Sequence, residues 1–154
     1  MPDNRARADG ARVLADLNAL RAIGAYKTGV HKPTFSEPHM RSLQWLAARL
    51  PEAHLTATID GIGNVFGTST KSGPKLLAGS HLESQNYAGW LDGPLGVAYA
   101  LEAARVLNSD PDVKGAVEVA AWCQACSATF SASVRISSTN RSLSWTNSGV
   151  VLIL

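Results

Sequence analysis

The sequence predicts an α/β fold in which helices pack on a mixed, mostly parallel sheet. The first observation behind this prediction is order: two helical patterns open the chain, and short apolar strand patterns follow them. The second is a strand, a helix and a further strand across residues 75–122, an order typical of parallel strands joined by a crossover helix. The third is size, because 154 residues with 45% hydrophobic and 17% charged side chains can bury a core without disulfides.

Two amphipathic helices are expected within the first 50 residues. Residues 9–24 place apolar side chains at helical spacing and end at a glycine. The apolar positions of this first helix are Val13, Leu14, Leu17, Leu20 and Ile23. Ser36, followed by Glu37 and Pro38, is typical of the cap and first turn of a second helix. The buried stripe of the second helix is predicted to consist of Met40, Leu43, Leu46, Ala47 and Leu50.

The strands are expected to begin after these helices. Two short β-branched segments, residues 55–60 and 64–68, flank a Gly-Ile-Gly turn, which predicts a hairpin. The apolar run KLLAGS at 75–80 is typical of a central strand. A helix over about 94–107, with a proline in its first turn, and a strand over 116–122 complete the predicted sheet.

The chain changes character after Trp122. Residues 119–154 contain no Asp, Glu, Lys or His, and residues 127–148 contain eight Ser. Neither a helical nor a strand period is present there, so no regular structure is predicted. We therefore divide the chain into a folded part, residues 1–122, and a tail over residues 123–154 that we expect to be disordered.

Charge and hydropathy argue against a nucleic-acid or membrane partner. The chain has 14 basic and 12 acidic residues in scattered positions, a formal net charge of +2, and no basic run. The first twenty residues include acidic side chains and lack the continuous apolar region of a signal peptide. The apolar run at Val150–Leu154 is too short to span a bilayer. A cytoplasmic location is the expectation that follows.

The two cysteines of the chain, Cys123 and Cys126, form a C-Q-A-C sequence. This spacing occurs in redox pairs and in half of many zinc sites. The sequence has no second C-x-x-C, no H-x-x-x-H and no thioredoxin-like unit around the pair. A chance spacing is therefore favoured, and a redox module stays as an alternative.

The segment from Gly79 to Val97, GSHLESQNYAGWLDGPLGV, carries the strongest functional signal. His81 follows a predicted strand and Asp92 precedes the next helix, and ligands of α/β sheets gather at the carboxyl ends of strands. Zinc accepts histidine nitrogen and aspartate oxygen, and one carboxylate can bridge two ions. Glu83 would then orient His81 by accepting the free N–H of its ring.

Ordinary turn and capping chemistry offers a second interpretation of the same segment. An Asp before Gly-Pro at a helix start is a common N-cap, a His after a strand is often a surface residue, and glycines make turns. Spacing alone leaves both interpretations open. Trp45 and Trp90 are expected to pack in the fold, whereas Tyr87 could pack or bind. The remaining histidines are expected to be solvated: His31, His39 and His54.

Several motifs across residues 12–122 occur in the order found in one enzyme family. They are T-G-V at 28–30, S-E-P and R-S-L-Q-W-L-A within 36–47, D-G-I-G-N-V-F-G at 60–67, G-S-H-L-E-S-Q at 79–85, and A-G-W-L-D-G-P-L-G-V at 88–97. The chain thus resembles the zinc amidohydrolases that include N-carbamoyl-L-amino-acid hydrolases, allantoate amidohydrolases and β-ureidopropionases, within the dinuclear metallopeptidase superfamily. The resemblance implies a zinc-peptidase-like catalytic domain, truncated in this chain.

The resemblance also implies a reaction and a metal centre. The reaction is hydrolysis of a ureido or amidino C–N bond in a small linear substrate, by metal-activated water and a glutamate base. His81 is implied as a ligand of one metal and Asp92 as the carboxylate that bridges two. The metals are usually zinc, with manganese or cobalt in some members. Glu83 stands where relatives often have Asp. Relatives are commonly homodimeric, through a domain that this sequence does not contain.

The resemblance fails after Trp122. Relatives carry two adjacent glutamates there, a general base and a metal ligand, whereas this chain has the C-Q-A-C sequence and no later acidic residue. A reading frame shifted from Ala125 permits, from the third base of codon 126 onward, the family-like peptide F-G-H-F-L-G-K-R-S-Y. Our hypothesis is a small deletion near Gln124 that removed the glutamates and shifted the frame.

The missing residues predict a loss of activity. A catalytic zinc needs about three protein ligands, and the sequence offers two recognisable ones and no recognisable catalytic residue. The chain as given is therefore expected to be inactive, with an incomplete two-metal site. The alternative is a non-catalytic remnant that self-associates or binds a full-length homologue.

Overall fold

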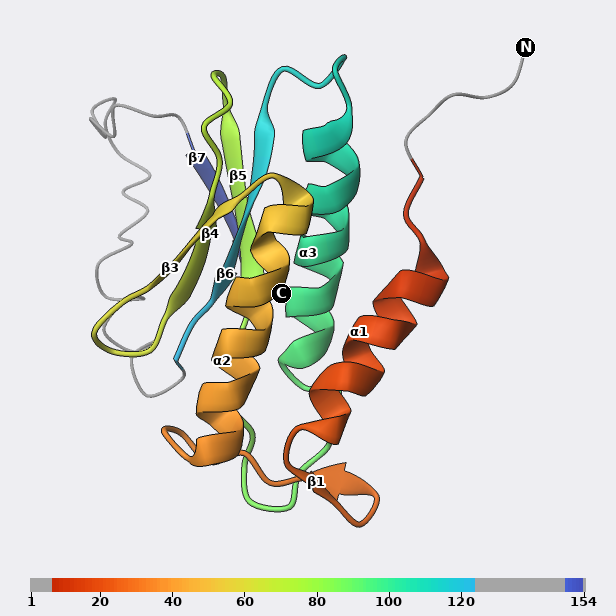
Figure 1. Ribbon diagram of the computed structural model, residues 1–154, viewed down its shortest axis with the longest axis vertical. Coiled ribbons are helices and arrows are strands. Elements are labelled where there is room, and N and C mark those ends of the chain that lie inside the picture. The colour runs from red at the N-terminus through yellow and green to blue at the C-terminus, as the bar shows by residue number, and fades with distance from the viewer. Residues whose placement is uncertain (1–6, 124–148, 154) are drawn as a thin grey trace, which may run out of the picture.

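The computed structural model describes residues 7–123 and 149–153 (Figure 1). The elements, in chain order, are α1 (Gly10–Ala22), β1 (Ala25–Tyr26), β2 (Gly29–Val30), α2 (Glu37–Arg49), the 3-10 helix η1 (Leu50–Ala53), β3 (Thr56–Ile59), β4 (Val65–Thr68), β5 (Lys75–Ser80), α3 (Pro94–Ser109), β6 (Ala116–Ala121) and β7 (Gly149–Ile153).

The main sheet is mixed, with the strand order β3-β4-β6-β5-β7. The pairs β3–β4 and β4–β6 are antiparallel, and the pairs β5–β6 and β5–β7 are parallel. The predicted α/β fold is thus confirmed, and its parallel character is confined to the half formed by β6, β5 and β7. The crossover through α3 makes β5 and β6 parallel, so that Ser80 pairs with Ala121 and both strands end at one edge.

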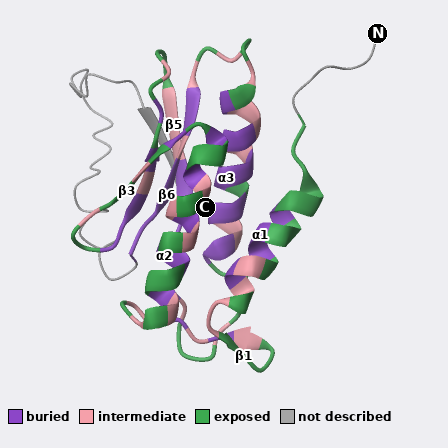
Figure 2. Ribbon diagram, viewed as in Figure 1, coloured by how far each residue is buried: buried purple, intermediate pink, exposed green. Residues whose placement is uncertain are grey.

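Helices α2 and α3 cover one face of the sheet, and α1 packs on α3 (Figure 1). Figure 2 shows buried residues where α3 meets the central strands and exposed residues on the outer turns of α1 and α2. The core is built from leucines of the helices and from small or β-branched residues of the strands. Its members include Leu20, Leu43, Leu46, Leu50, Val65, Ala78, Val97, Leu101, Val117 and Val119. Each buried leucine of this set contributes about 1.5–3 kcal/mol through removal of its surface from water.

Both predicted N-terminal helices are confirmed, with their caps. Asp9 caps α1 by accepting hydrogen bonds from two backbone N–H groups of the first turn. Ser36 caps α2 by accepting from the backbone N–H of His39. The predicted apolar stripes were wrong at their margins, since Leu14 is 59% exposed and Met40 is 37% exposed. Both lie at the edge of a stripe where neither the sheet nor another helix covers them.

Ion pairs with buried members on α3 join this helix to α1 and to η1. The guanidinium of Arg12 donates to both carboxylate oxygens of Glu102 at 2.7 and 2.8 Å. Arg105 of α3 forms ion pairs with Asp16 of α1 and with Glu52 of η1. Because Glu102, Arg105 and Asp16 are buried, these charges need one another, and the pairs fix how α1 lies on α3.

The short hairpin formed by β1 and β2 was not predicted. Each strand has only two residues, and Lys27 at the turn has a φ of 52°. Two-residue strands are too short to show an alternating pattern, so nothing in the sequence indicates them. Val30 of this hairpin forms an antiparallel bridge with Ala88, so that the hairpin meets the segment between β5 and α3.

Part of the predicted tail lies outside the described residues. Residues 124–148, which include Cys126, and residue 154 are in this part, so the disordered tail stays a prediction there, as does the cysteine pair. Within the range of the tail, the structure has a strand, β7, parallel to β5. No helix in the described ranges, 7–123 and 149–153, has the length and apolar character needed to cross a membrane.

Candidate metal centre

The structure brings His81 and Asp92 together. His81 directly follows β5, and the segment after it returns so that only Gly93 separates Asp92 from α3. The Nε2 atom of His81 lies 3.9 Å from Oδ1 of Asp92. The two side chains differ in exposure, with 18% for His81 and 86% for Asp92. The imidazole is therefore held by the fold, and the carboxylate stands at the surface of the same edge.

Gly93 makes this approach possible. It has a φ of +83°, a conformation that favours glycine. A Cβ atom at this position would lie 2.6 Å from Nδ1 of His81 and 2.5 Å from its backbone oxygen. Gly93 thus leaves the space that the imidazole of His81 occupies, because any other side chain at this position would push the ring away from the Asp92 carboxylate.

The capping interpretation of Asp92 is not what the structure shows. Gly93 occupies the N-cap position of α3, and no side chain makes the capping hydrogen bond. Pro94 follows as the first helical residue, so the N–H that it lacks needs no acceptor. The Asp92 carboxylate faces His81 instead of the first turn of the helix.

The backbone of Glu83 fixes the tautomer of His81. Nδ1 of His81 lies 3.0 Å from the backbone oxygen of Glu83. A carbonyl oxygen can only accept, so Nδ1 carries the proton, and Nε2 turns its lone pair toward Asp92. This is the tautomer that a metal bound at Nε2 requires.

The predicted role of the Glu83 carboxylate needs correction. The sequence assigned the orientation of His81 to this carboxylate, whereas the structure assigns it to the backbone carbonyl of the same residue. The reason is burial: the Glu83 side chain is 2% exposed and points to α2, where Oε2 lies 3.5 Å from Nε2 of His39.

The prediction that His39 is solvated was also wrong. His39 is 0% exposed, and its Nδ1 accepts a hydrogen bond of 3.0 Å from the backbone N–H of Phe35. Burial lowers the pKa of His39, while the neighbouring Glu83 opposes this effect, so the ring is held neutral near pH 7. His39 lies four residues before Leu43 and seven before Leu46, on the buried face of α2, so its helical spacing was a signal of burial.

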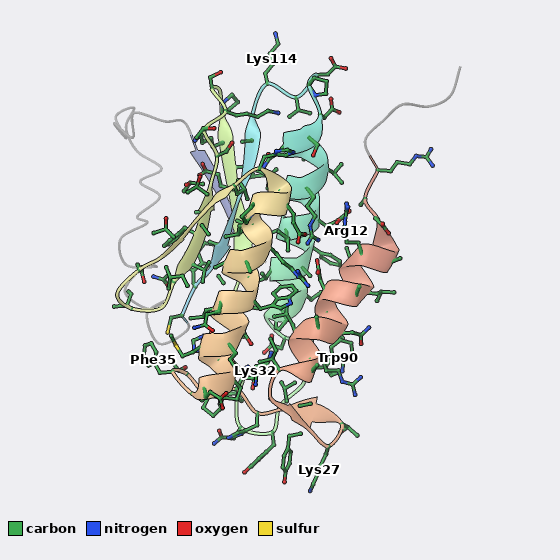
Figure 3. All side chains as sticks on the ribbon, in the orientation of Figure 1. Arg12, Lys27, Lys32, Phe35, Trp90 and Lys114 are labelled. Atoms are coloured by element: carbon green, nitrogen blue, oxygen red, sulfur yellow. The ribbon has the colours of Figure 1, made fainter. Side chains whose placement is uncertain are left out.

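Lys32 is a further buried polar residue, and it contacts the site segment, which comprises residues 81–93 between β5 and α3. It is 1% exposed, and its Nζ donates to the backbone oxygen of Leu20 at 2.9 Å and approaches Oγ of Ser42 at 3.4 Å. Figure 3 shows Lys32 between the ends of α1 and α2. Burial lowers the pKa of its ammonium group to about 8. Sequence reasoning gave no signal for Lys32, because nothing in its neighbours indicates burial.

The hairpin of β1 and β2 anchors the segment that carries the site. Val30 and Ala88 exchange backbone hydrogen bonds of 3.0 and 3.1 Å. Lys32 and Ser84 form a second reciprocal pair, in which the N–H of Lys32 donates to Oγ of Ser84 and the N–H of Ser84 donates to the backbone oxygen of Lys32. A Cβ atom at Gly29 would lie 2.2 Å from the backbone oxygen of Ala88. The glycine of the T-G-V motif is therefore required for close approach of the two backbones.

The D-G-I-G-N motif holds the carboxyl end of β6. Oδ1 of Asn64 accepts a hydrogen bond of 2.8 Å from the backbone N–H of Cys123, and its Nδ2 donates to Asp60 at 2.8 Å. The backbone N–H of Trp122 donates to the oxygen of Ser80 at 2.8 Å, which fixes the end of β6 beside the end of β5. Trp122 thus lies at the same edge of the sheet as His81.

The two donors fit part of a metal site. Histidine nitrogen and aspartate oxygen suit zinc, and two donors that each lie about 2.1 Å from one ion can be at most about 4.2 Å apart. The observed 3.9 Å satisfies this limit. No group of three or more His, Cys, Asp or Glu residues placed to hold a metal occurs within residues 7–123 and 149–153. The pair therefore fits as two ligands of an ion whose remaining ligands are not among the described residues.

An aromatic cluster lies next to the site segment. Tyr87 is stacked on His31, with ring centroids 4.7 Å apart, and contacts Tyr26 at 4.6 Å. Tyr87 is 63% exposed, whereas Trp45 and Trp90 pack against the core clusters as predicted. The cluster joins the hairpin to the site segment and leaves one aromatic face open to solvent.

Comparison with known proteins identifies first the fold and then the family. The structure matches a crystal structure of a hydantoinase/carbamoylase family amidase from Burkholderia phymatum with a TM-score of 0.74 and 45% identity, over 78% of this chain and 30% of that one. The chain is thus an α/β domain of the kind found in these amidases. No protein-family model matches it.

Curated relatives give the family. The chain is 34% identical over 104 residues to an N-carbamoyl-L-amino-acid amidohydrolase of Paenarthrobacter aurescens, covering 66% of this chain and 25% of the relative. It is 31% identical over 115 residues to an allantoate deiminase of Arabidopsis thaliana, covering 71% of this chain and 22% of the relative. The chain is therefore homologous to this family of amidohydrolases, as its motifs indicated, and spans about a quarter of the length of these two relatives.

Proposed function

We propose that this chain is part of a metal-dependent hydrolase of C–N bonds other than peptide bonds. The observation that carries the proposal is the His81–Asp92 pair, with Nε2 facing Oδ1 and Gly93 fitted against the ring. The substrate class proposed is a small ureido or amide compound such as an N-carbamoyl amino acid or allantoate. The support for this class is the names of the relatives from Paenarthrobacter aurescens and Arabidopsis thaliana.

His81 and Asp92 are the residues that would hold the metal, with Asp92 able to bridge two ions. Zinc is the ion proposed, with manganese or cobalt as substitutes, and it would supply Lewis acidity and an activated water. The backbone carbonyl of Glu83 keeps the proton on Nδ1 of His81. Gly93 keeps the space that the ring needs, and the exposure of Asp92 leaves the open side of the pair accessible to a ligand.

We further propose that the chain as given does not catalyse this reaction. The described residues supply two donors, and a catalytic zinc takes about three protein ligands. At the end of β6, beside His81, the chain has Cys123, where the family resemblance calls for an acidic residue. A thiol does not replace the carboxylate general base, and no group of three or more His, Cys, Asp or Glu residues within 7–123 and 149–153 is placed to hold a metal.

Zinc content and hydrolysis test both parts of the proposal. The purified chain is equilibrated with zinc, freed of excess metal and analysed for bound zinc beside the variant His81→Ala, with circular dichroism as a control for folding. We expect at most one equivalent of zinc, lost in the variant, and no product from N-carbamoyl amino acids or allantoate. Equal zinc contents would overturn the metal centre, and two equivalents with turnover would overturn the inactivity.

A second candidate function is a non-catalytic remnant that self-associates or binds a full-length homologue. The observation that favours it is β3, an edge strand of the sheet whose Ile59 is 42% exposed. Unpaired backbone groups on an edge strand can pair with another chain. Light scattering across a concentration series tests this candidate, because association should be reduced by Thr58→Pro, whereas a monomer at all concentrations contradicts self-association.

A further inference from the structure

A buried polar contact connects α2 to the segment that carries the candidate metal pair. His39 lies on the first turns of α2 and Glu83 lies two residues after His81. Both side chains are buried, and Nε2 of His39 lies 3.5 Å from Oε2 of Glu83. This is a salt-bridge distance, longer than a normal hydrogen bond, so the contact is electrostatic in character.

The ring of His39 is oriented from its other nitrogen. The backbone N–H of Phe35 donates to Nδ1 at 3.0 Å, so Nδ1 must accept. A neutral imidazole has one donor and one acceptor nitrogen, which places the proton on Nε2. The protonated nitrogen of His39 is thereby the one nearest the Glu83 carboxylate, at a distance too long for a hydrogen bond.

The opposite end of Glu83 contacts His81. Its backbone oxygen accepts from Nδ1 of His81 at 3.0 Å. Glu83 therefore contacts the buried imidazole of His39 with its side chain and the imidazole of His81 with its backbone. A change in the contact between His39 and the Glu83 side chain can therefore alter the orientation of His81, because both contacts depend on the position of Glu83.

We infer that His39 is a positioning residue for the candidate metal pair, acting through Glu83 to keep Nε2 of His81 open to a metal. The inference rests on the proposed function, since it concerns the ligand that this function needs. His39 would not contact the ion or the substrate itself.

The physical reason is the cost of a buried carboxylate. Removing the N–H that faces it raises this cost, and the chain can lower it by moving the carboxylate toward water. Such a movement displaces the Glu83 backbone oxygen, and His81 then loses the acceptor that holds its proton on Nδ1. Loss of an orienting partner of a metal-ligating histidine typically weakens metal binding about 10–100-fold.

Two substitutions at position 39 separate this role from an ordinary structural one. His39→Gln can present an amide N–H near the place of Nε2 but loses the acceptor for Phe35. His39→Asn can accept from Phe35 near the place of Nδ1 but presents nothing to Glu83. The inference expects the Gln variant to behave like the original chain and the Asn variant to be defective.

Two properties are measured. The first is the tautomer of His81, determined by nitrogen-15 NMR of the metal-free chain at a pH above the titration range of histidine. The second is the zinc affinity, determined by competition with a chromophoric chelator. We expect the Nδ1–H tautomer and unchanged zinc affinity in His39→Gln. In His39→Asn we expect a mixture of tautomers and zinc binding weaker by about 10–100-fold. Retention of both properties in His39→Asn overturns the inference, as does a defect found only in His39→Gln.

Glu83→Ala provides a second test that does not depend on folding of the position-39 variants. This variant removes the carboxylate but keeps the backbone oxygen. If His81 is still entirely in the Nδ1–H tautomer, the inference is overturned. A mixture of the two His81 tautomers supports it. The tautomer comparison needs no metal. If the original chain binds no zinc, the proposed function fails, while the tautomers still decide whether His39 positions His81.

Discussion

Gly93 is the residue on which the His81–Asp92 approach depends most directly. With a φ of +83° and no room for a Cβ beside the imidazole, it combines two requirements that only glycine meets. Gly93→Ala is expected to destabilise the fold by about 1–3 kcal/mol through backbone strain and to abolish zinc binding at His81. Urea unfolding and zinc titration measure the two effects.

The matched control for this prediction is Gly89→Ala in the same segment. A Cβ atom at Gly89 meets nothing within 4 Å. This variant should keep the stability and zinc affinity of the original chain. Normal zinc binding in Gly93→Ala would show that the imidazole does not need the space that the glycine leaves.

Lys32 makes the stability of the fold depend on pH. Its pKa falls from 10.5 to about 8 because burial disfavours the ammonium form. Below pH 8 both the folded and unfolded states carry the proton, and folding bears a cost of about 3 kcal/mol. Between pH 8 and 10.5 the unfolded state binds more protons, so the free energy of unfolding rises with pH.

Comparison with Lys32→Met isolates this effect from other groups that titrate at high pH. The original chain should gain up to about 3 kcal/mol relative to the variant between pH 7.5 and 10.5 in urea unfolding. His39, the titratable neighbour of Lys32, is already neutral over this range. Parallel stability curves for the two proteins would mean that the ammonium group is not buried in solution.

At the scale of single residues, the sequence could predict which side chains of the candidate site come together but not what holds them. His81 and Asp92 were expected at one edge because they stand at ends of elements that the sequence indicates clearly, and their role as metal ligands stays a prediction. Glu83 was assigned to the right partner through the wrong atom, because the direction of its buried side chain is decided by packing that the local sequence does not contain. His39 was placed in solvent although its spacing from Leu43 and Leu46 puts it on the buried face of α2.

At the scale of elements, the site segment is held by a hairpin too short to predict. The bridge between Val30 and Ala88 and the narrow space at Gly29 bring the two backbones together. Gly29→Ala is expected to break this bridge and to increase amide hydrogen exchange at both bridge residues by about tenfold or more, since one lost backbone pair costs about 1–3 kcal/mol. Zinc affinity should fall with it.

Gly61→Ala is the control for the hairpin prediction, since a Cβ atom there meets nothing within 4 Å. Exchange at Val30 and Ala88 should remain slow in that variant. Slow exchange in Gly29→Ala as well would show that the hairpin adapts and does not anchor the site segment.

The long elements were predictable because each combines a period with an end signal. Ser36 caps α2, the Gly-Ile-Gly turn joins β3 to β4, and the crossover through α3 makes β5 and β6 parallel, all as the sequence indicated. The sequence did not indicate β1 and β2, which are too short to show an alternating pattern, or β7, which pairs with the distant strand β5. Leu14 and Met40 were misassigned because a helical period defines a stripe but not how much of it a neighbouring layer covers.

At the scale of the whole molecule, the ends of β5 and β6 meet at one edge of the sheet. The backbone hydrogen bond from Trp122 to Ser80 places Trp122 beside the end of β5, which His81 directly follows. The family resemblance implies acidic residues directly after this tryptophan, where the chain has Cys123. The hypothesis that a frame shift near Gln124 removed them stays a prediction from the sequence.

Sequencing the coding DNA across codons 120–140 tests that hypothesis. We expect a second frame in which two glutamate codons follow the tryptophan codon and a long amidohydrolase-like reading frame continues. The chain expressed from the repaired frame should bind two zinc equivalents and hydrolyse a ureido or amide substrate, because it has the third ligand and the base that the described residues lack. Early stop codons in both other frames would refute the frame shift and leave His81 and Asp92 as an incomplete pair.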